Sequence, residues 1–302
     1  MLLPSPPRYD YSAIVDRPAY DWPGGRRLAF YLALNVEQFA FGRGSGHTPH
    51  NWSNALDTRI YAWRDYGTRV GIWNILDLVE ELGLPCTFLM NSAVCERMPA
   101  IVRRINASGG EVVGHGRTNA ERPGDLFEED ERRVLREVAD TIARYHGAPP
   151  QGWMAPWISE SGVTADLLKE EGYRYIMHWP CDDQPIYLRT RSGPLLNVPY
   201  PIEMNDAPFI LNRGHSAEEF AHGMIDQFDV MLKLSAKWPL VCPVSLHTFI
   251  FGPPFRLAAL ERALRHIARF KDDARVWFTS PGKIAAHVMT LPAGTVPGDG
   301  TA

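Results

Sequence analysis

Short apolar runs alternate along the chain with segments whose apolar residues recur at helical spacing. The first run, Leu28-Ala-Phe-Tyr-Leu-Ala-Leu34, is continuous and gives way at once to the polar Asn35-Val-Glu37 segment. A run of this kind is typical of a parallel strand that is covered on both faces. Over residues 68–82 the apolar side chains instead recur at helical spacing, which predicts an amphipathic helix ending at Gly83.

The same alternation continues to the end of the chain. Further strands are expected at residues 86–90, 111–113, 152–154, 173–177, 195–198, 240–246 and 275–278. Further helices are expected to start near residues 99, 128, 164, 216, 257 and 281. Strand and helix thus alternate about seven times without a change in composition, which favours one parallel α/β barrel over two domains. A doubly wound open sheet is the alternative, although no Gly-rich phosphate loop opens the first helix.

The predicted single domain spans residues 1–302, and three of its segments lie outside the regular pattern. Residues 1–27 are polar and Pro-rich, and we expect them to form an arm on the surface or on a neighbouring subunit. Residues 291–302 are rich in Pro and Gly and are predicted to form a flexible tail. Residues 38–65 are predicted to form a long irregular loop, and the aromatic residues in it favour a functional role over disorder.

Composition narrows the classes of function. The 302 residues are 45% hydrophobic and 22% charged, as in an ordinary soluble globular protein, and a net charge of -4 predicts no nucleic-acid partner. No apolar run has the length of a membrane span and the first residues lack a signal-peptide pattern, so we expect no membrane contact and a cytoplasmic location. Many of the 9 tryptophans and 25 prolines lie in expected loops, which suggests a cleft for a small-molecule substrate or a cover over the barrel end. With the Pro-rich arm, they predict a homo-oligomer, either a dimer or a tetramer.

Polar and titratable residues follow several of the predicted strands at their carboxyl ends. They are Glu37, Asn91, His115, the Pro156-Trp157 turn, the segment 178–183 and His247. In a β/α barrel these ends meet on one face, where the active site lies. Core packing is a poor explanation for several polar and titratable groups on one face, because burying them together would remove all of them from water at a cost in free energy. The glycines on either side of His115 let the backbone turn sharply and present its imidazole.

Five of these segments, in this order, resemble the motifs of the polysaccharide deacetylase (NodB-homology) superfamily. They are Asn35-Val-Glu37, Gly114-His115-Gly116, Gly152-Trp-Met-Ala-Pro-Trp157, Asp182-Asp183-Gln184-Pro185 and Leu246-His247. Within the superfamily the chain is most similar to the intracellular branch that includes metal-independent allantoinases and cyclic imide hydrolases. The resemblance extends over roughly residues 20–290 and implies a distorted (β/α)7 barrel that hydrolyses C–N bonds other than peptide bonds.

The motifs that hold a metal in the metal-dependent members of this superfamily are altered here. Asn35 and Glu37 occupy the places of two aspartates, and His115 is followed by Asn119 where those members have a second histidine. An amide is a weak zinc ligand beside imidazole or carboxylate. We therefore expect no cofactor; a zinc or other divalent ion, if bound, would use Glu37 and His115.

Hydrolysis of an amide or imide needs an activated water, donors facing the developing oxyanion and a proton for the leaving nitrogen. We expect Glu37 to be the base, with His115 and His247 polarising the carbonyl and protonating the leaving nitrogen. Asp183, or its neighbour Asp182, would orient one of the imidazoles. The alternatives are structural: Glu37 paired with an arginine, His247 bonded to a carbonyl in the core, and the two aspartates in an exposed loop.

The expected substrate-binding residues lie around the same strand ends. They are Arg117, Asn119, Trp153, Pro156, Trp157, Asp182 and Phe251. Arg117 would hold an anionic group of the substrate, or else pair with Glu121. For each of the aromatic residues, packing in the core is the alternative to lining the pocket.

The sequence therefore predicts an allantoinase-like hydrolase that opens the ring of a small cyclic amide, imide or ureide. One alternative is a metal-dependent N-deacetylase of an amino-sugar or polysaccharide, which a stoichiometric zinc would indicate. The other is a carbohydrate- or ligand-binding relative that has lost catalysis along with the metal ligands. A serine-hydrolase triad is disfavoured because Ser159 and Ser161 lack a Gly-x-Ser-x-Gly elbow.

Overall fold

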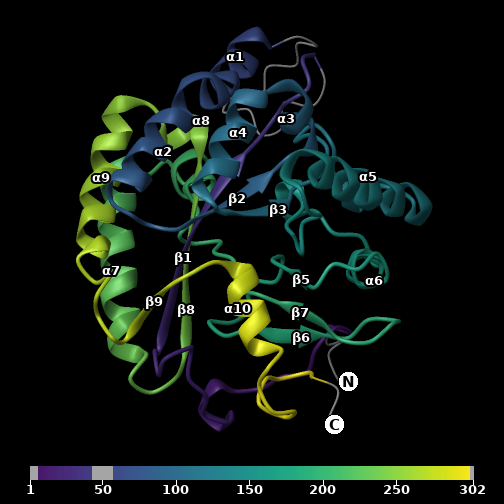
Figure 1. The fold of residues 1–302 in the computed structure, drawn as a ribbon, viewed down its shortest axis with the longest axis vertical. Helices are drawn as coiled ribbons and strands as arrows, with labels where there is room; N and C mark the ends of the chain where they lie inside the picture. Colours follow the sequence, from purple (N-terminus) through teal and green to yellow (C-terminus); the bar gives the residue numbers. More distant parts are fainter. Residues whose placement is uncertain (1–5, 43–56, 300–302) are drawn as a thin grey trace.

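The computed structural model of the chain describes residues 6–42 and 57–299. Its strands form one curled sheet in the order β6-β7-β5-β4-β3-β2-β1-β8, and β9 pairs with β1 (Figure 1). The strands are β1 Leu28–Val36, β2 Cys86–Met90, β3 Glu111–Gly114, β4 Gly152–Trp153, β5 Tyr175–Ile176, β6 Ile186–Leu188, β7 Leu195–Asn197, β8 Leu240–His247 and β9 Val276–Phe278. All pairs are parallel except β6 with β7, so the structure is a distorted β/α barrel, as predicted.

Helices cover the outer face of this sheet, with α7 and α9 beside β1 and β8 and with α5 on the opposite side (Figure 1). The helices are α1 Thr58–Tyr66, α2 Ile72–Glu81, α3 Ser92–Arg97, α4 Pro99–Ser108, α5 Glu128–His146, α6 Thr164–Glu170, α7 Ala217–Leu234, α8 Thr248–Phe251, α9 Pro254–Ala268 and α10 Pro281–Val288. None of the helices in the described ranges is both long enough and apolar enough to cross a bilayer.

β1 pairs with β2, β8 and β9 and is buried along its whole length. Side chains alternate across a strand, so its bulky residues Phe30, Leu32 and Leu34 pack under the helices, while the small Ala29 and Ala33 face the barrel interior. β9 pairs with the first part of β1 and β2 with the last part, so two short strands share one edge of β1. The continuous apolar run of β1 is therefore the run of a strand with two buried faces, as the sequence predicted.

The segment between β1 and α2 differs from the expected long loop. Its residues 43–56 lie outside the described structure, but α1 begins at Thr58 and continues through a π-helical turn, Gly67–Gly71, into α2. The glycines of this turn allow a close approach to α8, because a Cβ on Gly71 would collide with the carbonyl oxygen of Thr248. The prediction of a loop to residue 65 was wrong, because α1 buries only Ile60 and Arg64 and its apolar side chains form no stripe at helical spacing.

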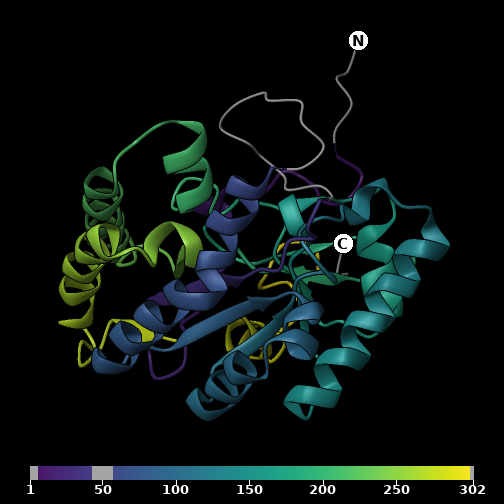
Figure 2. The ribbon, with the colours of Figure 1, turned by 90° about the horizontal axis from the view of Figure 1, so that it is seen from above.

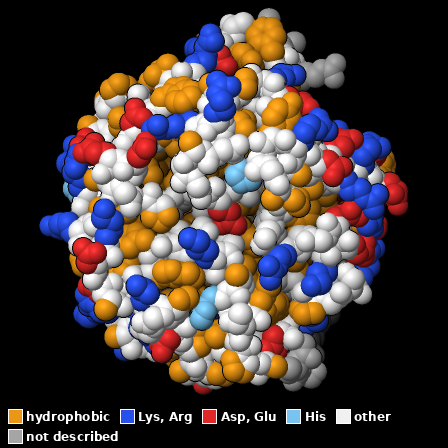
Figure 3. Space-filling model, in the orientation of Figure 1, with side chains coloured by type: hydrophobic (Ala, Val, Ile, Leu, Met, Phe, Trp, Pro, Cys, Tyr) orange, Lys and Arg blue, Asp and Glu red, His pale blue; other side chains and the backbone are white. Residues whose placement is uncertain are grey.

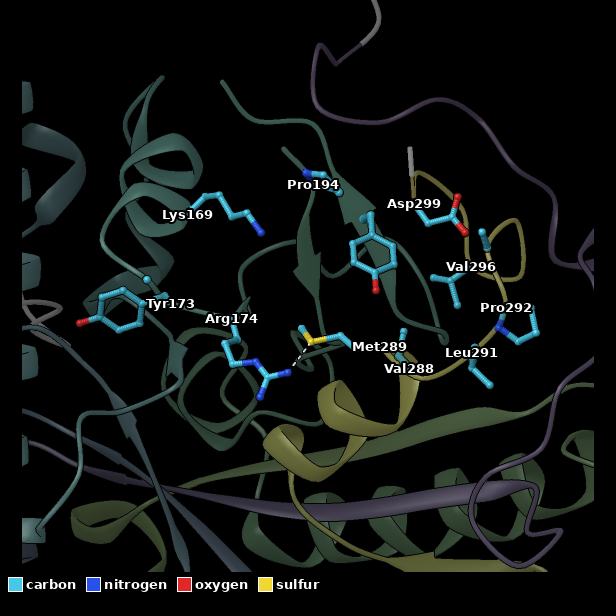
Figure 4. Close-up of a pocket in the computed structure, with 13 residues that line it drawn as sticks. Lys169, Tyr173, Arg174, Pro194, Val288, Met289, Leu291, Pro292, Val296 and Asp299 are labelled. Atoms are coloured by element: carbon cyan, nitrogen blue, oxygen red, sulfur yellow. Dashed lines mark hydrogen bonds between the residues drawn. The ribbon is translucent and has the colours of Figure 1, made fainter. Parts of the chain in front are cut away.

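The tail is also packed, contrary to the expectation of a flexible end. Val296 is buried, and the carbonyl of Pro297 accepts a hydrogen bond of 2.7 Å from the backbone N–H of Tyr187 in β6. Side chains of the tail line a cavity of about 470 Å³ together with Lys169 and Arg174 (Figure 4). Burial and backbone pairing therefore fix this segment up to residue 299 despite its Pro- and Gly-rich sequence.

The N-terminal arm lies on the barrel through two partly buried ion pairs. The guanidinium of Arg8 is 2.8 Å from Asp166, and that of Arg17 is 2.6 Å from Asp182. The carbonyl of Arg8 also accepts from the backbone N–H of Arg189, which follows β6. The short antiparallel strand β6, which the sequence did not predict, is therefore covered along its outer edge by the arm and by the tail.

Candidate active site

A cavity of about 460 Å³ opens at the carboxyl ends of β1, β3 and β8. Figure 2 views the molecule from this end. The cavity is lined by Asn35, Glu37, Phe39, Arg64, His115, Asn119, Arg122, Met154, Trp157, Ile158, Tyr200, Ile202, Asn205, Ala207, Pro208, Leu211, Asn212, His247 and Phe249. About half of these side chains are apolar, and three titratable ones, Glu37, His115 and His247, lie together on one wall, an arrangement typical of a small-molecule site.

Glu37, His115 and His247, which are far apart in the sequence, meet on that wall. The Oε1 atom of Glu37 lies 3.4 Å from Nε2 of His115 and 3.5 Å from Nε2 of His247. The sheet brings them together, because Asn35 of β1 pairs in register with His247 of β8. On the other side of β1, the N–H of His115 bonds to Met90 at the end of β2. The predicted convergence of these three residues is confirmed.

Each imidazole is held by its other ring nitrogen. Nδ1 of His115 donates to the carbonyl of Met154 at 2.5 Å, and Nδ1 of His247 donates to Oδ1 of Asp206 at 2.6 Å. Oδ2 of Asp206 also accepts from the backbone N–H of His247, at 2.8 Å, and this aspartate is fully buried. Both rings are therefore locked with Nε2 directed at the Glu37 carboxylate.

The charges of the site stabilise one another. Burial alone raises the pKa of Glu37, but the attraction of His247, His115 and Arg64 outweighs burial and brings this pKa below its usual value. Burial alone lowers the pKa of His247, but the carboxylates of Glu37 and Asp206 outweigh it and bring this pKa above its usual value. A carboxylate that stays ionised beside an imidazolium that stays protonated can act as a general base and a general acid at the same pH.

The donor set does not fit the metal centre of the metal-dependent deacetylases. Asn119 directs its amide N–H at Oε1 of Glu37, while its carbonyl oxygen accepts a hydrogen bond of 3.1 Å from Asn91. The position of the second histidine thus holds a hydrogen-bond donor rather than a metal ligand. Across residues 6–42 and 57–299, no group of three or more His, Cys, Asp or Glu side chains is arranged to hold a metal ion.

Of the residues predicted to bind substrate, Asn119 and Trp157 line the cavity. The indole N–H of Trp157 donates to the carbonyl of Asn119 at 3.0 Å. Trp157 and Ile158 both have positive φ, 64° and 52°, a conformation that costs free energy for residues other than glycine. Pro156 is buried behind this strained turn, against Gly116, and supports the cavity wall without lining it.

Asp183 and Asp182 were predicted at the site and lie at the opposite end of the barrel. The carbonyl of Asp183 accepts from Val241, the second residue of β8, whereas His247 is the last residue of that strand, about 20 Å further along at 3.3 Å per residue. Asp182 pairs with Arg17 of the arm. The prediction of roles for both was wrong, because the turn after β5 leads the chain back across the sheet edge to the antiparallel β6.

Three other predicted substrate-binding residues also lie outside the cavity. Arg117 takes the alternative role foreseen for it and pairs with Glu121 at 2.9 Å and with Glu137 at 2.7 Å. Trp153 is fully buried, with its ring 5.6 Å from that of Tyr173. Phe251 is likewise fully buried, with its ring 5.2 Å from that of Phe220. In each case an ion pair or core packing satisfies a side chain that the sequence alone placed near the site.

Asp206 and Arg64 are among the residues of the site that were missed in the sequence. Asp206 takes the orienting role that was assigned to Asp183, because the bridge between Asn205 and Ser245 lays its segment beside β8. Arg64 lines the cavity from α1, within the segment predicted as loop. The sequence around Asn205 and Asp206 looks like that of any other pair of polar residues in a loop, so it does not mark Asp206 as a site residue.

The chain was compared with known proteins. The family model of polysaccharide deacetylase matches residues 55–176. The crystal structure of a probable polysaccharide deacetylase from Pseudomonas aeruginosa PAO1 is 26% identical, with a TM-score of 0.79, over 91% of this chain and 97% of that one. The crystal structure of PuuE allantoinase is 27% identical, with a TM-score of 0.77, over 94% of this chain and 99% of that one. Peptidoglycan deacetylase of Helicobacter pylori is 30% identical over 152 residues, which are 49% of this chain and 50% of that protein.

The match to the polysaccharide deacetylase model extends over residues 55–176, and the matched solved structures extend over nearly the whole of the barrel. Four of the five motif segments lie at the carboxyl ends of strands, where the resemblance in sequence placed them, whereas Asp182-Asp183-Gln184-Pro185 lies at the opposite end of the barrel. With a match to the deacetylase model and with deacetylase and allantoinase neighbours, the protein is a hydrolase of carbon–nitrogen bonds.

Proposed function

We propose that this protein opens the ring of a small cyclic amide, imide or ureide by direct attack of water, without a bound metal. The proposal rests on one observation: the Glu37 carboxylate lies between the Nε2 atoms of two imidazoles that are locked by their other ring nitrogens. The similarity to PuuE allantoinase over nearly the full chain supports a cyclic substrate. The amide of Asn119, in the place of a metal ligand, supports a reaction that depends on the side chains alone.

The proposed reaction uses each of these groups once. Glu37 accepts a proton from the water as its oxygen bonds to the substrate carbonyl carbon. His247, protonated and held by Asp206, donates its Nε2 proton to the ring nitrogen as the C–N bond breaks. The proton on Glu37 then passes across 3.5 Å to His247, which restores both groups. The hydrogen bond of His115 to the carbonyl of Met154 holds its ring in place beside Glu37.

The size and shape of the site agree with a small substrate. The cavity of about 460 Å³ accommodates a five- or six-membered ring with a short side chain, and the rings of Phe39, Trp157 and Phe249 form one side of it. Figure 3 shows a side face of the molecule, turned 90° from the view of Figure 2, and on it the Lys and Arg side chains are interspersed with Asp and Glu side chains.

The test is hydrolysis of a panel of hydantoins, imides, dihydropyrimidines and allantoin by purified protein, before and after treatment with a chelator. We expect turnover of at least one cyclic compound, with undiminished kcat/KM after chelation. Turnover of N-acetylated amino-sugars alone, lost on chelation and restored by zinc, would refute the proposal and identify a metal-dependent deacetylase. Binding of these compounds without turnover would identify a non-catalytic relative.

A further inference from the structure

One peptide group connects the active site to a second buried histidine. The carbonyl of Met154 accepts from Nδ1 of His115 at 2.5 Å. The N–H of Ala155, which belongs to the same planar peptide, donates to Nε2 of His178 at 2.7 Å. His178 follows β5, and its side chain is fully buried behind the cavity wall. The sequence placed this histidine among the polar residues at the strand ends, and the proposed reaction leaves it without a role.

The chemistry of the peptide fixes where the protons lie. A backbone N–H only donates, so Nε2 of His178 is the acceptor nitrogen and the proton of the neutral ring is on Nδ1. That proton is directed at Oε2 of Glu160, 3.3 Å away. A backbone carbonyl only accepts, so Nδ1 of His115 carries a proton as well. The donors therefore all point in one direction, from His115 through the peptide and His178 to Glu160.

Hydrogen bonds in such a chain strengthen one another. The carbonyl of a peptide becomes a better acceptor when the N–H of that peptide donates to a strong acceptor, such as an imidazole with a carboxylate behind it. The bond that locks the ring of His115 beside Glu37 is thus supported from behind the cavity wall. The same peptide begins the turn at Trp157 and Ile158, whose positive φ values need support from their surroundings.

We propose that His178 is a positioning residue of the reaction. In its neutral form, with the proton on Nδ1, it holds the peptide between Met154 and Ala155. Through that peptide it keeps the imidazole of His115 oriented with Nε2 towards the Glu37 carboxylate. The inference rests on the proposed function for the importance of His115, whereas the hydrogen-bonded chain does not depend on which substrate is bound.

Acid is expected to break the chain. A second proton on His178 would have to go to Nε2, which would then no longer accept from the N–H of Ala155. The charges that face His178 are the carboxylate of Glu160 and that of the buried Glu131 in α5, and both favour the added proton. Arg8 of the arm acts on Glu160 and opposes this effect. Activity that depends on His178 is therefore present while its ring is neutral and is lost as the pH falls.

The experiment compares His178→Asn with His178→Gln. Glutamine places its amide near the position of Nε2 and can accept from Ala155, whereas the shorter asparagine places its amide near Nδ1 and leaves that N–H without its acceptor. Loss of one buried hydrogen bond corresponds to roughly 10-fold, and we expect His178→Asn to lower kcat for the best cyclic substrate by that factor. We expect KM of this variant, and kcat of His178→Gln, to stay within about threefold of the wild type. The same two substitutions at His222, which is exposed on α7, are the matched controls.

A second measurement needs no substrate. The nitrogen NMR signals of the His115 imidazole, identified by their absence in His115→Gln, report which ring nitrogen carries the proton. We expect a protonated Nδ1 in the wild type and in His178→Gln, and a proton shared between both ring nitrogens in His178→Asn. An unchanged kcat in His178→Asn, or equal losses in both variants, would overturn the proposal. If no cyclic compound is hydrolysed, the proposed function fails, and unchanged His115 signals in His178→Asn would then overturn the positioning role as well.

If His178→Asn does not fold, as judged by circular dichroism and thermal unfolding, the wild type and His178→Gln carry the test through their pH profiles. Glutamine cannot take up a proton, so we expect the wild type to lose kcat/KM on acidification at a higher pH than the variant. The acid limb that remains in the variant belongs to Glu37, whose pKa lies below its usual value. Coincident acid limbs of the two proteins would overturn the proposal that the neutral form of His178 holds the site.

Discussion

Replacing Asp206 by Asn tests whether His247 acts as a protonated acid. The substitution keeps the size of the side chain, so the oxygen that accepts from the backbone N–H of His247 can stay in place. It removes the negative charge that lies 2.6 Å from Nδ1 of His247. The imidazolium then loses one of the two carboxylates that keep its pKa above the usual value, while the effect of burial, which lowers this pKa, is unchanged.

The magnitude follows from the nature of that contact. A buried hydrogen bond between charged partners contributes about 1.5–3 kcal/mol, and 1.36 kcal/mol corresponds to a tenfold change in protonation. The alkaline limb of the pH profile of kcat/KM is therefore expected to move down by about one to two pH units. Activity that needs the imidazolium is present below the pKa of His247 and is lost above it. At a pH above both limbs the variant should be slower by roughly 10- to 100-fold, and at acidic pH the loss should be smaller.

The assay is the pH dependence of kcat/KM for the best cyclic substrate, measured on wild type, Asp206→Asn and Asp183→Asn. Asp183 is the matched control, because it was a candidate for the same role and lies at the other end of β8. We expect its variant to follow the wild-type profile. An Asp206→Asn enzyme with an unmoved alkaline limb and a uniform loss at every pH would refute the reasoning and leave Asp206 a purely structural role.

Three further predictions concern the base, the turn and the metal. Glu37→Gln should lower kcat/KM by about 10²- to 10⁴-fold, because it removes the base; full turnover would exclude Glu37 as the base. Gly116→Ala should destabilise the protein more than Gly109→Ala. The two glycines have similar positive φ angles, 65° and 68°, so the backbone strain is the same in both variants. Only at Gly116 would the new Cβ also collide with a neighbour, since it would lie 2.9 Å from Cγ of Pro156. Strain alone should cost about 1–2 kcal/mol at Gly109, so equal melting temperatures of the two variants would contradict the expected clash. Treatment with a chelator should leave kcat/KM within about twofold of the value for the untreated protein. If metal analysis instead finds a stoichiometric metal that activity requires, the conclusion that the site does not fit a metal is wrong.

Much of the site could be predicted from the sequence, because its main residues lie at the carboxyl ends of strands. Glu37, His115 and His247 each follow an apolar run, and parallel strands place their carboxyl ends on one face whatever the details of the loops. The same logic failed for Asp183, since the chain after β5 turns back into the antiparallel strand β6. Three apolar residues in a row are too few to show a period, so this strand and its consequence were not visible in the sequence.

The sequence by itself determined the barrel, its buried first strand and the carboxylate and two imidazoles at the strand ends, because hydrophobic periodicity and chain order specify these locally. Only the tertiary structure decided that Asp206 holds His247 and that Arg64 lies among aromatic rings in the cavity. These contacts are made between segments that are far apart in the sequence. One sequence has no signal for them, because any polar residue in a loop has many partners within reach until the chain is folded.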